Sequence, residues 1–185
     1  LKDKNSIIIG NVARIDLEKK GQDILLHAIA LVKIKYPNIF CVFAGADMTE
    51  NESELGKLKE IVKELDLESN VKFLGNVDNV FEFLSEIDVF VLPSRVEGFG
   101  ISLIEAMAMG IPCIASDVGG PAEIIGKEER GLLFSVDDAR QLAEKIFTMI
   151  ERYTEQSRVA IQSISYIKKN FDIKNMCEEL VNLYG

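Results

Sequence analysis

The sequence has few of the residues that build metal, disulfide or hydrolase sites. Its three cysteines, Cys41, Cys113 and Cys177, lie far apart and form no C-x-x-C pair. This spacing argues against a zinc site or a disulfide framework, and we expect buried thiols in a reducing cytoplasm. The only histidine, His27, follows Ile24-Leu-Leu and precedes Ala-Ile, so we expect it on a helix flank without a catalytic role. No Asp-x-Asp pair, P-loop or G-x-S-x-G elbow occurs, which argues against the corresponding metal-diphosphate, nucleotide and hydrolase sites.

Basic charge and long apolar runs are also scarce. Lysine and arginine number 21 against 30 acidic residues, which gives a net charge of −9. A nucleic-acid partner is therefore not expected, because its phosphates need a basic surface. Every apolar stretch is broken before about 18 residues, and the start does not resemble a signal peptide. We expect no transmembrane segment and a cytoplasmic protein, either free or peripheral to the membrane.

What the chain does contain is the composition of one globular domain: 185 residues, of which 48% are hydrophobic. Apolar runs of strand length alternate with amphipathic helical patterns, which predicts parallel βαβ units and a doubly wound α/β sheet. The predicted strands are residues 6–10, 39–44, 71–74, 89–92, 113–115 and 131–134. The predicted helices are residues 22–35, 54–66, 80–84, 101–109, a short helix from 119, and 137–184 with breaks near 153 and at 170–172.

In such a sheet, ligands bind beyond the carboxyl ends of the strands. A glycine-bearing loop leads there into a predicted helix, at Glu97-Gly-Phe-Gly-Ile-Ser-Leu-Ile-Glu105. Gly98 and Gly100 allow close approach of a ligand to the backbone. The N–H groups near Gly100, Ile101 and Ser102 lack intrahelical acceptors, and with the helix dipole they suit a phosphate.

Two glutamates bracket this helix start. Glu105 lies about one turn further along, roughly 6–8 Å from the helix end at 1.5 Å per residue, where it can accept hydrogen bonds from a ribose. Glu97 lies in the preceding loop and can reach a group at the far end of a diphosphate. A nucleoside, two phosphates and a hydroxyl-rich group together describe a nucleotide sugar. The alternative is that both glutamates are solvated surface residues, because glycines near helix starts are common.

Two cations, Arg14 and Lys20, follow the first predicted strand and fall at the same sheet edge as the Glu97 loop. There they would neutralise a diphosphate and the charge that grows on it as a leaving group. The alternative is that Lys19 and Lys20 are an ordinary solvated pair before a helix.

These motifs together resemble those of a known family, the retaining glycosyltransferases of the GT-B fold in the group 1 (family 4) class, in their C-terminal, donor-binding domain. The resemblance covers nearly the whole chain and is most specific in the two glutamates, read together with the other motifs. Ala13, where many members have glycine, is a mild departure. The matching motifs are Asn11-Val-Ala-Arg14 with Lys20-Gly21, Val71-Lys-Phe-Leu-Gly75, Pro93-Ser94, Glu97-Gly-Phe-Gly, Glu105-Ala-Met-Ala-Met-Gly110, and Asp117-Val-Gly-Gly120 with Glu123.

The resemblance implies a role for each candidate site residue. Glu97 at the donor-sugar hydroxyls, with Arg14 and Lys20 at the diphosphate, would be the catalytic residues, and Glu105 would bind the ribose. The donor would be a UDP-sugar or GDP-sugar, with no metal or other cofactor. The remaining donor-binding positions are the turn Gly75, Asn76 and Val77 at the base, and Gly98, Phe99, Gly100 and Ile101 at the phosphates.

Members of this family carry a second, N-terminal domain that binds the acceptor and supplies a catalytic histidine, and 185 residues cannot include it. We therefore expect half of a hexosyltransferase of carbohydrate or polysaccharide biosynthesis, inactive alone, whose acceptor is a sugar, a lipid-linked sugar or a polysaccharide. Residues 1–170 would form the Rossmann-like nucleotide-sugar domain. Residues 171–185 would form a helix that packs on the absent domain and, without it, frays or self-associates.

Two other interpretations stay open at this point. One is another GT-B enzyme, such as a nucleotide-sugar epimerase. The other is a non-enzymatic receiver-like or flavodoxin-like module with the same sheet. A receiver needs an acidic pocket after its first strand, whereas this chain has the cation Arg14 there.

Overall fold

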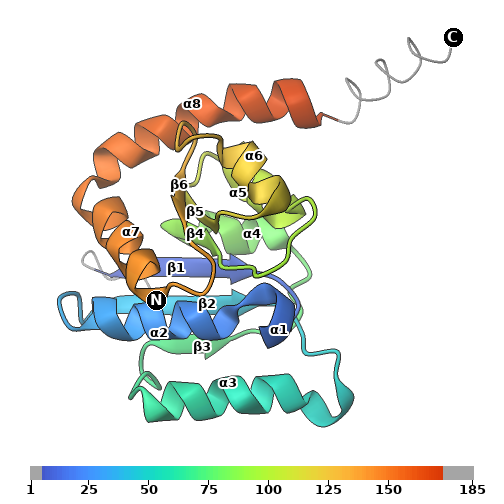
Figure 1. The fold of residues 1–185 in the computed structure, drawn as a ribbon, viewed down its shortest axis with the longest axis vertical. Coiled ribbons are helices and arrows are strands. Elements are labelled where there is room, and N and C mark those ends of the chain that lie inside the picture. Colours follow the sequence, from blue (N-terminus) through green and yellow to red (C-terminus); the bar gives the residue numbers. More distant parts are fainter. Residues whose placement is uncertain (1–5, 173–185) are drawn as a thin grey trace, which may run out of the picture.

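Six parallel strands form a single sheet in the computed structural model, which describes residues 6–172 (Figure 1). The strand order is β3-β2-β1-β4-β5-β6, so the order reverses between β1 and β4. This order is that of a doubly wound sheet and confirms the predicted fold class. The strands are β1 (Ile7–Val12), β2 (Ile39–Ala44), β3 (Val71–Phe73), β4 (Val89–Leu92), β5 (Cys113–Ser116) and β6 (Leu132–Phe134).

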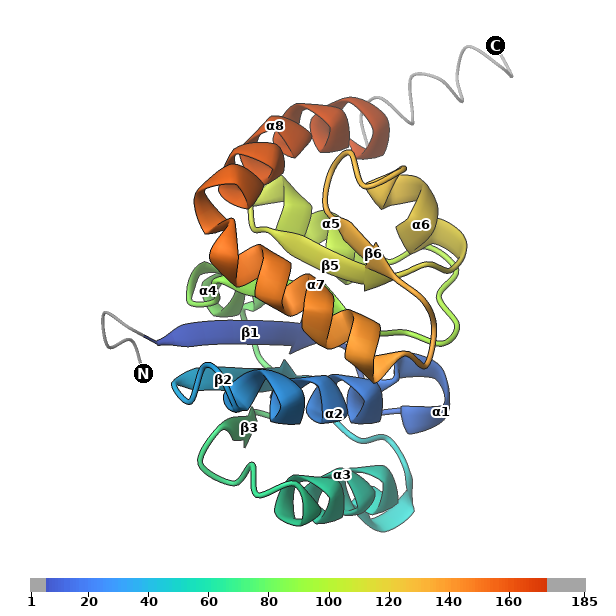
Figure 2. The same cartoon turned by 60° about the vertical axis from the view of Figure 1, so that its left-hand side comes forward.

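Helices cover both faces of the sheet (Figures 1 and 2). On one face the core includes residues of α2, α3 and α7, and on the other it includes residues of α4, α5, α6 and α8. The helices are α1 (Leu17–Lys20), α2 (Gln22–Lys33), α3 (Ser53–Glu64), preceded by the 3-10 turn η1 (Glu50–Glu52), α4 (Val80–Ser85), α5 (Ile101–Ala108), α6 (Gly119–Ile125), α7 (Ala139–Glu151) and α8 (Tyr153–Phe171).

The continuous apolar run of β1 is explained by its place in the middle of the sheet. Ile9 points into one core and Ile8 into the other, so both faces of the strand are buried. The strand is longer than predicted, because it continues to Val12 and includes the polar Asn11. Asn11 pairs in register with Phe43, and its side-chain amide donates to the Val91 carbonyl at 2.9 Å. That bond satisfies the amide N–H of this fully buried side chain, whereas its Oδ1 has no partner among the described residues.

Other predicted boundaries differ by a few residues, and one local expectation was wrong. Helix α2 ends at Lys33 and not at 35, because the N–H groups of Lys35 and Tyr36 both bond back to Val32 in a closing turn ahead of Pro37. The segment after β1, expected to be a loop, contains the short helix α1. The predicted helical tail beyond 172 and the thiol of Cys177 lie outside the described residues.

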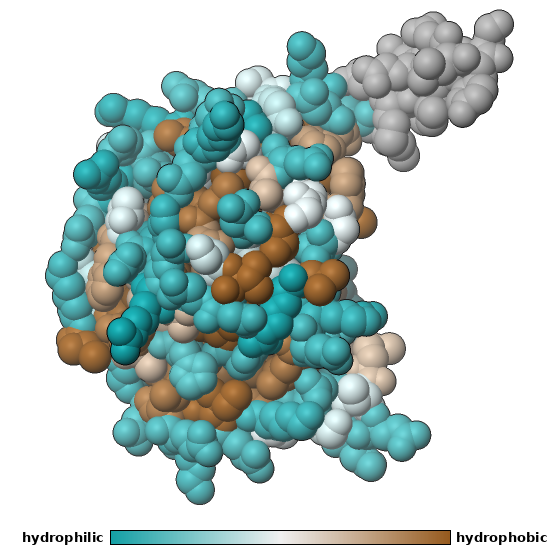
Figure 3. Space-filling view, in the orientation of Figure 1, coloured by the Kyte–Doolittle hydropathy of each residue, from teal (hydrophilic) through white to brown (hydrophobic). Residues whose placement is uncertain are grey.

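The two methionines after the glycine loop differ in environment. Met107 is buried in the core, whereas Met109 is 36% exposed at the end of α5. The molecular face in Figure 3 is mostly hydrophilic, with apolar side chains in separate patches. Within residues 6–172, no helix combines the length and the apolar character that crossing a bilayer requires.

Candidate functional site

A cavity of about 590 Å³ lies at the carboxyl ends of β1 and β4, where the strand order reverses. Its walls come from the segment after β1, the β4–α5 loop and the first turns of α5. This is the place at which doubly wound sheets bind ligands. The residues that line it are Val12, Ala13, Arg14, Lys20, Glu97, Phe99, Gly100, Ile101, Ser102 and Glu105. The structure thus brings seven of the predicted site residues into one cavity.

The β1 side of the cavity carries the two predicted cations. Arg14 pairs with Asp16 at 3.0 Å, and its own side chain is 55% exposed. Asp16 also accepts the backbone N–H of Lys19, which caps the N-terminus of α1. The Arg14 carbonyl accepts a 2.8 Å hydrogen bond from the buried Gln22 amide. These bonds give the segment between β1 and α2 a defined path, with Arg14 and Lys20 both at the cavity.

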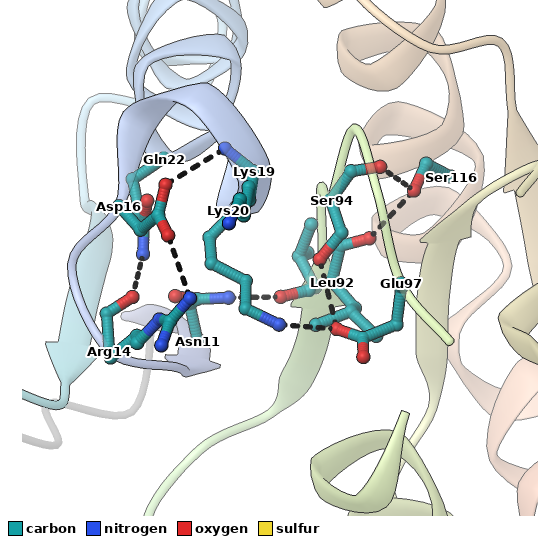
Figure 4. A network of polar contacts seen from close by, with 11 residues as sticks. Asn11, Arg14, Asp16, Lys19, Lys20, Gln22, Leu92, Ser94, Glu97 and Ser116 are labelled. Atoms are coloured by element: carbon teal, nitrogen blue, oxygen red, sulfur yellow. Dashed lines mark hydrogen bonds and ion pairs between the residues drawn. The ribbon is translucent and has the colours of Figure 1, made fainter. Parts of the chain in front are cut away.

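Lys20 and Glu97 form an ion pair across the cavity, with 2.7 Å between Nζ and Oε2. Both side chains are largely buried, and we call this contact the cavity ion pair. Ser94 Oγ lies 3.4 Å from the same carboxylate oxygen, and Ser116 Oγ in turn donates to the Ser94 carbonyl at 2.5 Å (Figure 4). The carboxylate of Glu97 is therefore tied to the tips of both β4 and β5.

The N-terminus of α5 faces the same cavity without a side-chain cap. Its N-cap is Gly100, which has a left-handed φ of 86° that side-chain-bearing residues rarely adopt. The first N–H groups of the helix, at Ile101 and Ser102, accordingly have no intrahelical acceptor. Together with the helix dipole they make the floor of the cavity attractive to an anion.

Glu105 lies one turn into α5 and is partly withdrawn from water. Burial raises the pKa of this carboxyl above its ordinary value. A carboxyl whose pKa rises on folding favours its protonated form in the folded state. Its ionisation therefore costs stability as the pH rises through that raised pKa.

We therefore expect Glu105→Gln to increase the free energy of unfolding at pH 7. The gain should shrink as the pH is lowered towards about 4, the ordinary range of a glutamate, where the native carboxyl also becomes neutral. Urea unfolding at several pH values measures this difference, with Glu60→Gln on the exposed face of α3 as the control. A variant that is less stable than the parent at neutral pH would contradict the prediction.

Three predicted base contacts lie apart from this cavity. Asn76 and Val77 line a different cavity, of about 530 Å³, beside α4. Gly75 is held at the sheet edge, where its carbonyl accepts a 2.8 Å bond from Gly45. Gly98 belongs to the β4–α5 loop but is not among the lining residues. His27 is exposed on α2 and also lies outside the cavity, as predicted.

Several residues that support the site were not predicted from the sequence. Ser116 and Gln22 are buried polar residues whose hydrogen bonds support the two loops. Arg95, between Ser94 and Glu97 in the β4–α5 loop, makes an ion pair with Asp23. In the sequence, these residues could have been noticed only as polar residues close to a buried strand or at the start of a helix. In the described part of the chain, no three His, Cys, Asp or Glu side chains are grouped so that they could hold a metal ion.

Comparisons with known proteins agree on one family. The family model described as "Glycosyl transferases group 1" matches residues 1–165. The chain is 27% identical over 168 residues to the lipopolysaccharide core biosynthesis mannosyltransferase LpsB of Rhizobium meliloti, a match that covers 90% of this chain and 48% of LpsB. It is 31% identical over 184 residues to the putative glycosyltransferase EpsF of Bacillus subtilis, covering 97% of this chain and 44% of EpsF. The chain thus spans about half the length of these curated relatives.

Solved structures show the same relationship. The Anabaena protein HepE in complex with UDP and glucose superposes with a TM-score of 0.90 at 25% identity, over 97% of this chain and 48% of HepE. The C-terminal domain of a Francisella tularensis group 1 glycosyl transferase, LpcC, gives a TM-score of 0.78 at 26% identity, over 90% of this chain and 87% of that domain. The chain thus matches the C-terminal domain of a longer group 1 glycosyl transferase. Neither the epimerase nor the receiver-like interpretation is favoured by these findings.

Proposed function

We propose, because this chain belongs to the glycosyl transferases of group 1, that its cavity between β1 and β4 binds the nucleotide-sugar donor of a hexosyl transfer. One observation carries the proposal. Arg14, Lys20, the uncapped N-terminus of α5, Glu97 and Glu105 all line a single cavity, in which Lys20 contacts Glu97. Positive groups together with two carboxylate acceptors match a diphosphate that links two hydroxyl-bearing groups.

The diphosphate would lie between the two cations and the start of α5. Lys20 and Arg14 would donate charge-assisted hydrogen bonds to its oxygens from one side. The backbone N–H groups of Ile101 and Ser102 would donate from the other. Because these groups supply the positive charge, we propose that no metal ion takes part in donor binding.

The two glutamates would recognise opposite ends of the donor. Glu105 would accept hydrogen bonds from the ribose, and Glu97 would accept them from the sugar hydroxyls. Lys20 and Ser94 both contact Oε2 of the Glu97 carboxylate, and Oε1 would face the sugar. We further propose that the base extends towards the turn of Asn76 and Val77.

In the transfer step, the bond between the anomeric carbon and the phosphate oxygen breaks and a bond to an acceptor hydroxyl oxygen forms. The electron pair stays on the nucleoside diphosphate, and the proton of the acceptor hydroxyl passes to an oxygen of that leaving diphosphate. Lys20, Arg14 and the α5 N–H groups would stabilise the charge that develops on the leaving diphosphate. We propose that the anomeric configuration is retained and that the acceptor is held by a separate N-terminal domain.

The proposal is tested by calorimetry on this 185-residue chain with UDP, GDP, UDP-glucose and GDP-mannose. We expect weak binding of at least one nucleoside diphosphate and of its nucleotide sugar. A dissociation constant of about 0.1–1 mM is a reasonable scale for half of a site, corresponding to roughly −4 to −5.5 kcal/mol. The matching nucleoside without phosphates should bind far more weakly, and a chelator should leave the constants unchanged.

Sugar transfer provides the second readout. With donor and a mixture of simple sugars, the chain alone should release no free nucleoside diphosphate above the uncatalysed rate. No binding of any nucleoside diphosphate at several millimolar would count against the donor site. Robust turnover by this chain alone would show that the acceptor site does not require another domain.

A further inference from the structure

Arg95 lies outside the cavity, yet its guanidinium joins three separate segments near it. Its Nη1 and Nη2 atoms donate to the two carboxylate oxygens of Asp23, at 2.9 and 2.8 Å. Its Nε donates to Asp137 at 2.6 Å, and Nη1 also donates to the Leu17 carbonyl. Asp23 lies in the first turn of α2, Leu17 begins α1, and Asp137 precedes α7. The side chain is only 25% exposed.

The main chain of the same loop is equally close to α1. The N–H groups of Arg95 and Val96 both donate to the Lys19 carbonyl, at 2.8 and 3.1 Å. At the α1–α2 corner, a Cβ placed on Gly21 would come within 2.2 Å of the Pro93 carbonyl oxygen. Gly21 has a φ of 62°, so glycine suits this position for two reasons. The β4–α5 loop and the α1–α2 corner thus touch backbone to backbone.

The cavity ion pair crosses this same contact. In the sequence, Lys20 lies between Lys19, whose carbonyl accepts the two N–H groups of the loop, and Gly21, which packs closely against Pro93. Glu97 is two residues beyond Arg95. The position of one partner of the pair relative to the other is therefore set by how the loop sits on α1 and α2.

We propose that Arg95 is a positioning residue, which fixes the β4–α5 loop on α1 and α2 so that Glu97 lies opposite Lys20. The inference rests on the proposed donor function. A bidentate arginine–carboxylate contact fixes direction as well as distance, which a single point charge does not. Without the Arg95 side chain, the loop that carries Glu97 loses its side-chain contacts with α2, with the Leu17 carbonyl of α1 and with the segment before α7, and keeps its main-chain bonds to Lys19. Lys20 and the N-terminus of α5 keep their own supports. Arg95 should accordingly affect recognition of the sugar more than recognition of the diphosphate.

The test compares nucleotide sugar with nucleoside diphosphate on the same variants. Arg95→Gln should weaken UDP-glucose or GDP-mannose by about five- to tenfold, the scale of coupling between contacting residues, and UDP or GDP by less than about twofold. Asp23→Asn should change the ratio of the two constants in the same direction but less, and Arg95→Lys should restore part of it. Lys145→Gln is the matched control, because it removes the Lys145–Glu128 ion pair of α7, away from the cavity.

The outcomes separate the inference from the function on which it rests. If Arg95→Gln and Asp23→Asn leave the ratio of the two dissociation constants unchanged, whether both ligands bind as before or both weaken equally, the positioning role is overturned and the donor function is left intact. Failure of the parent chain to bind any of the four ligands removes both. Thermal melts identify variants that do not fold. If Arg95→Gln is one of them, the near-isosteric Asp23→Asn and the charge-preserving Arg95→Lys decide the question.

Discussion

Replacing Lys20 by methionine is expected to weaken binding of UDP or GDP by about ten- to a hundredfold. A charge-assisted hydrogen bond contributes roughly 1.5–3 kcal/mol, and each 1.4 kcal/mol is a factor of ten in the constant. The Lys20 side chain is only 20% exposed, so water cannot readily take the place of its ammonium group. The matching nucleoside should bind almost unchanged, because it carries no phosphate. Calorimetry with the diphosphate and the nucleoside measures both effects.

The loss of Lys20 also leaves Glu97 without its partner, and this second effect must be separated from the first. An unpaired carboxylate beside a diphosphate repels it, so the single variant overstates the contribution of the ammonium group. Comparison of Lys20→Met with the same change in a Glu97→Gln background removes that repulsion. Lys19→Met is the control, since Lys19 is the adjacent cation but does not line the cavity. Equal losses for nucleoside and diphosphate, or a matching loss in the Lys19 control, would place the diphosphate elsewhere.

The fold followed from local patterns in the sequence. Buried runs of strand length, such as residues 39–44 and 89–92, appear as β2 and β4 with the predicted limits. Their alternation with amphipathic helices is a local property of the chain, and the parallel, doubly wound arrangement follows from general rules of connection. The position of the cavity followed as well. The ends of β1 and β4 must meet at the point where the strand order reverses, which brings the Arg14 and Glu97 loops together.

Contacts between those loops could not be predicted from local sequence patterns. The cavity ion pair joins residues 77 positions apart, and the Arg95–Asp23 pair joins residues 72 apart. Which of several acids a given cation meets depends on side-chain rotamers and on angstrom-scale packing of two loops. Local patterns therefore predict Lys20 and Glu97 on one edge of the sheet, each with a ligand as its partner, but not the ion pair between them. The turn of Asn76 and Val77 follows a strand of the same sheet but lines a different cavity, and its contact with the base stays a prediction.

The second large effect is expected at Gly120, the second residue of α6. A Cβ at this position would lie 2.6 Å from the carbonyl oxygens of Gly98 and Phe99, and 2.7 Å from the Phe99 Cα. All three atoms belong to the backbone of the glycine loop, so no side-chain rotation can relieve the contact. Either α6 or the loop must move.

We expect Gly120→Ala to lower the free energy of unfolding by about 1–3 kcal/mol, the usual cost of overpacking. A displaced glycine loop would also carry Glu97 and the N-terminus of α5 away from the ligand. Affinity for both the diphosphate and the nucleotide sugar should therefore fall on the order of tenfold, the equivalent of about one charge-assisted hydrogen bond.

Gly56→Ala is the matched control, because a Cβ there meets no atom within 4 Å and α3 is helical at that point. It should stabilise the chain by roughly 0.5–1 kcal/mol and leave both affinities unchanged. If the close contact is real, denaturant unfolding shows the free energy of unfolding changing in opposite directions in the two variants, and calorimetry shows weaker binding in Gly120→Ala but not in Gly56→Ala. A Gly120→Ala variant that is as stable and binds as tightly as the parent would show that α6 does not constrain the loop.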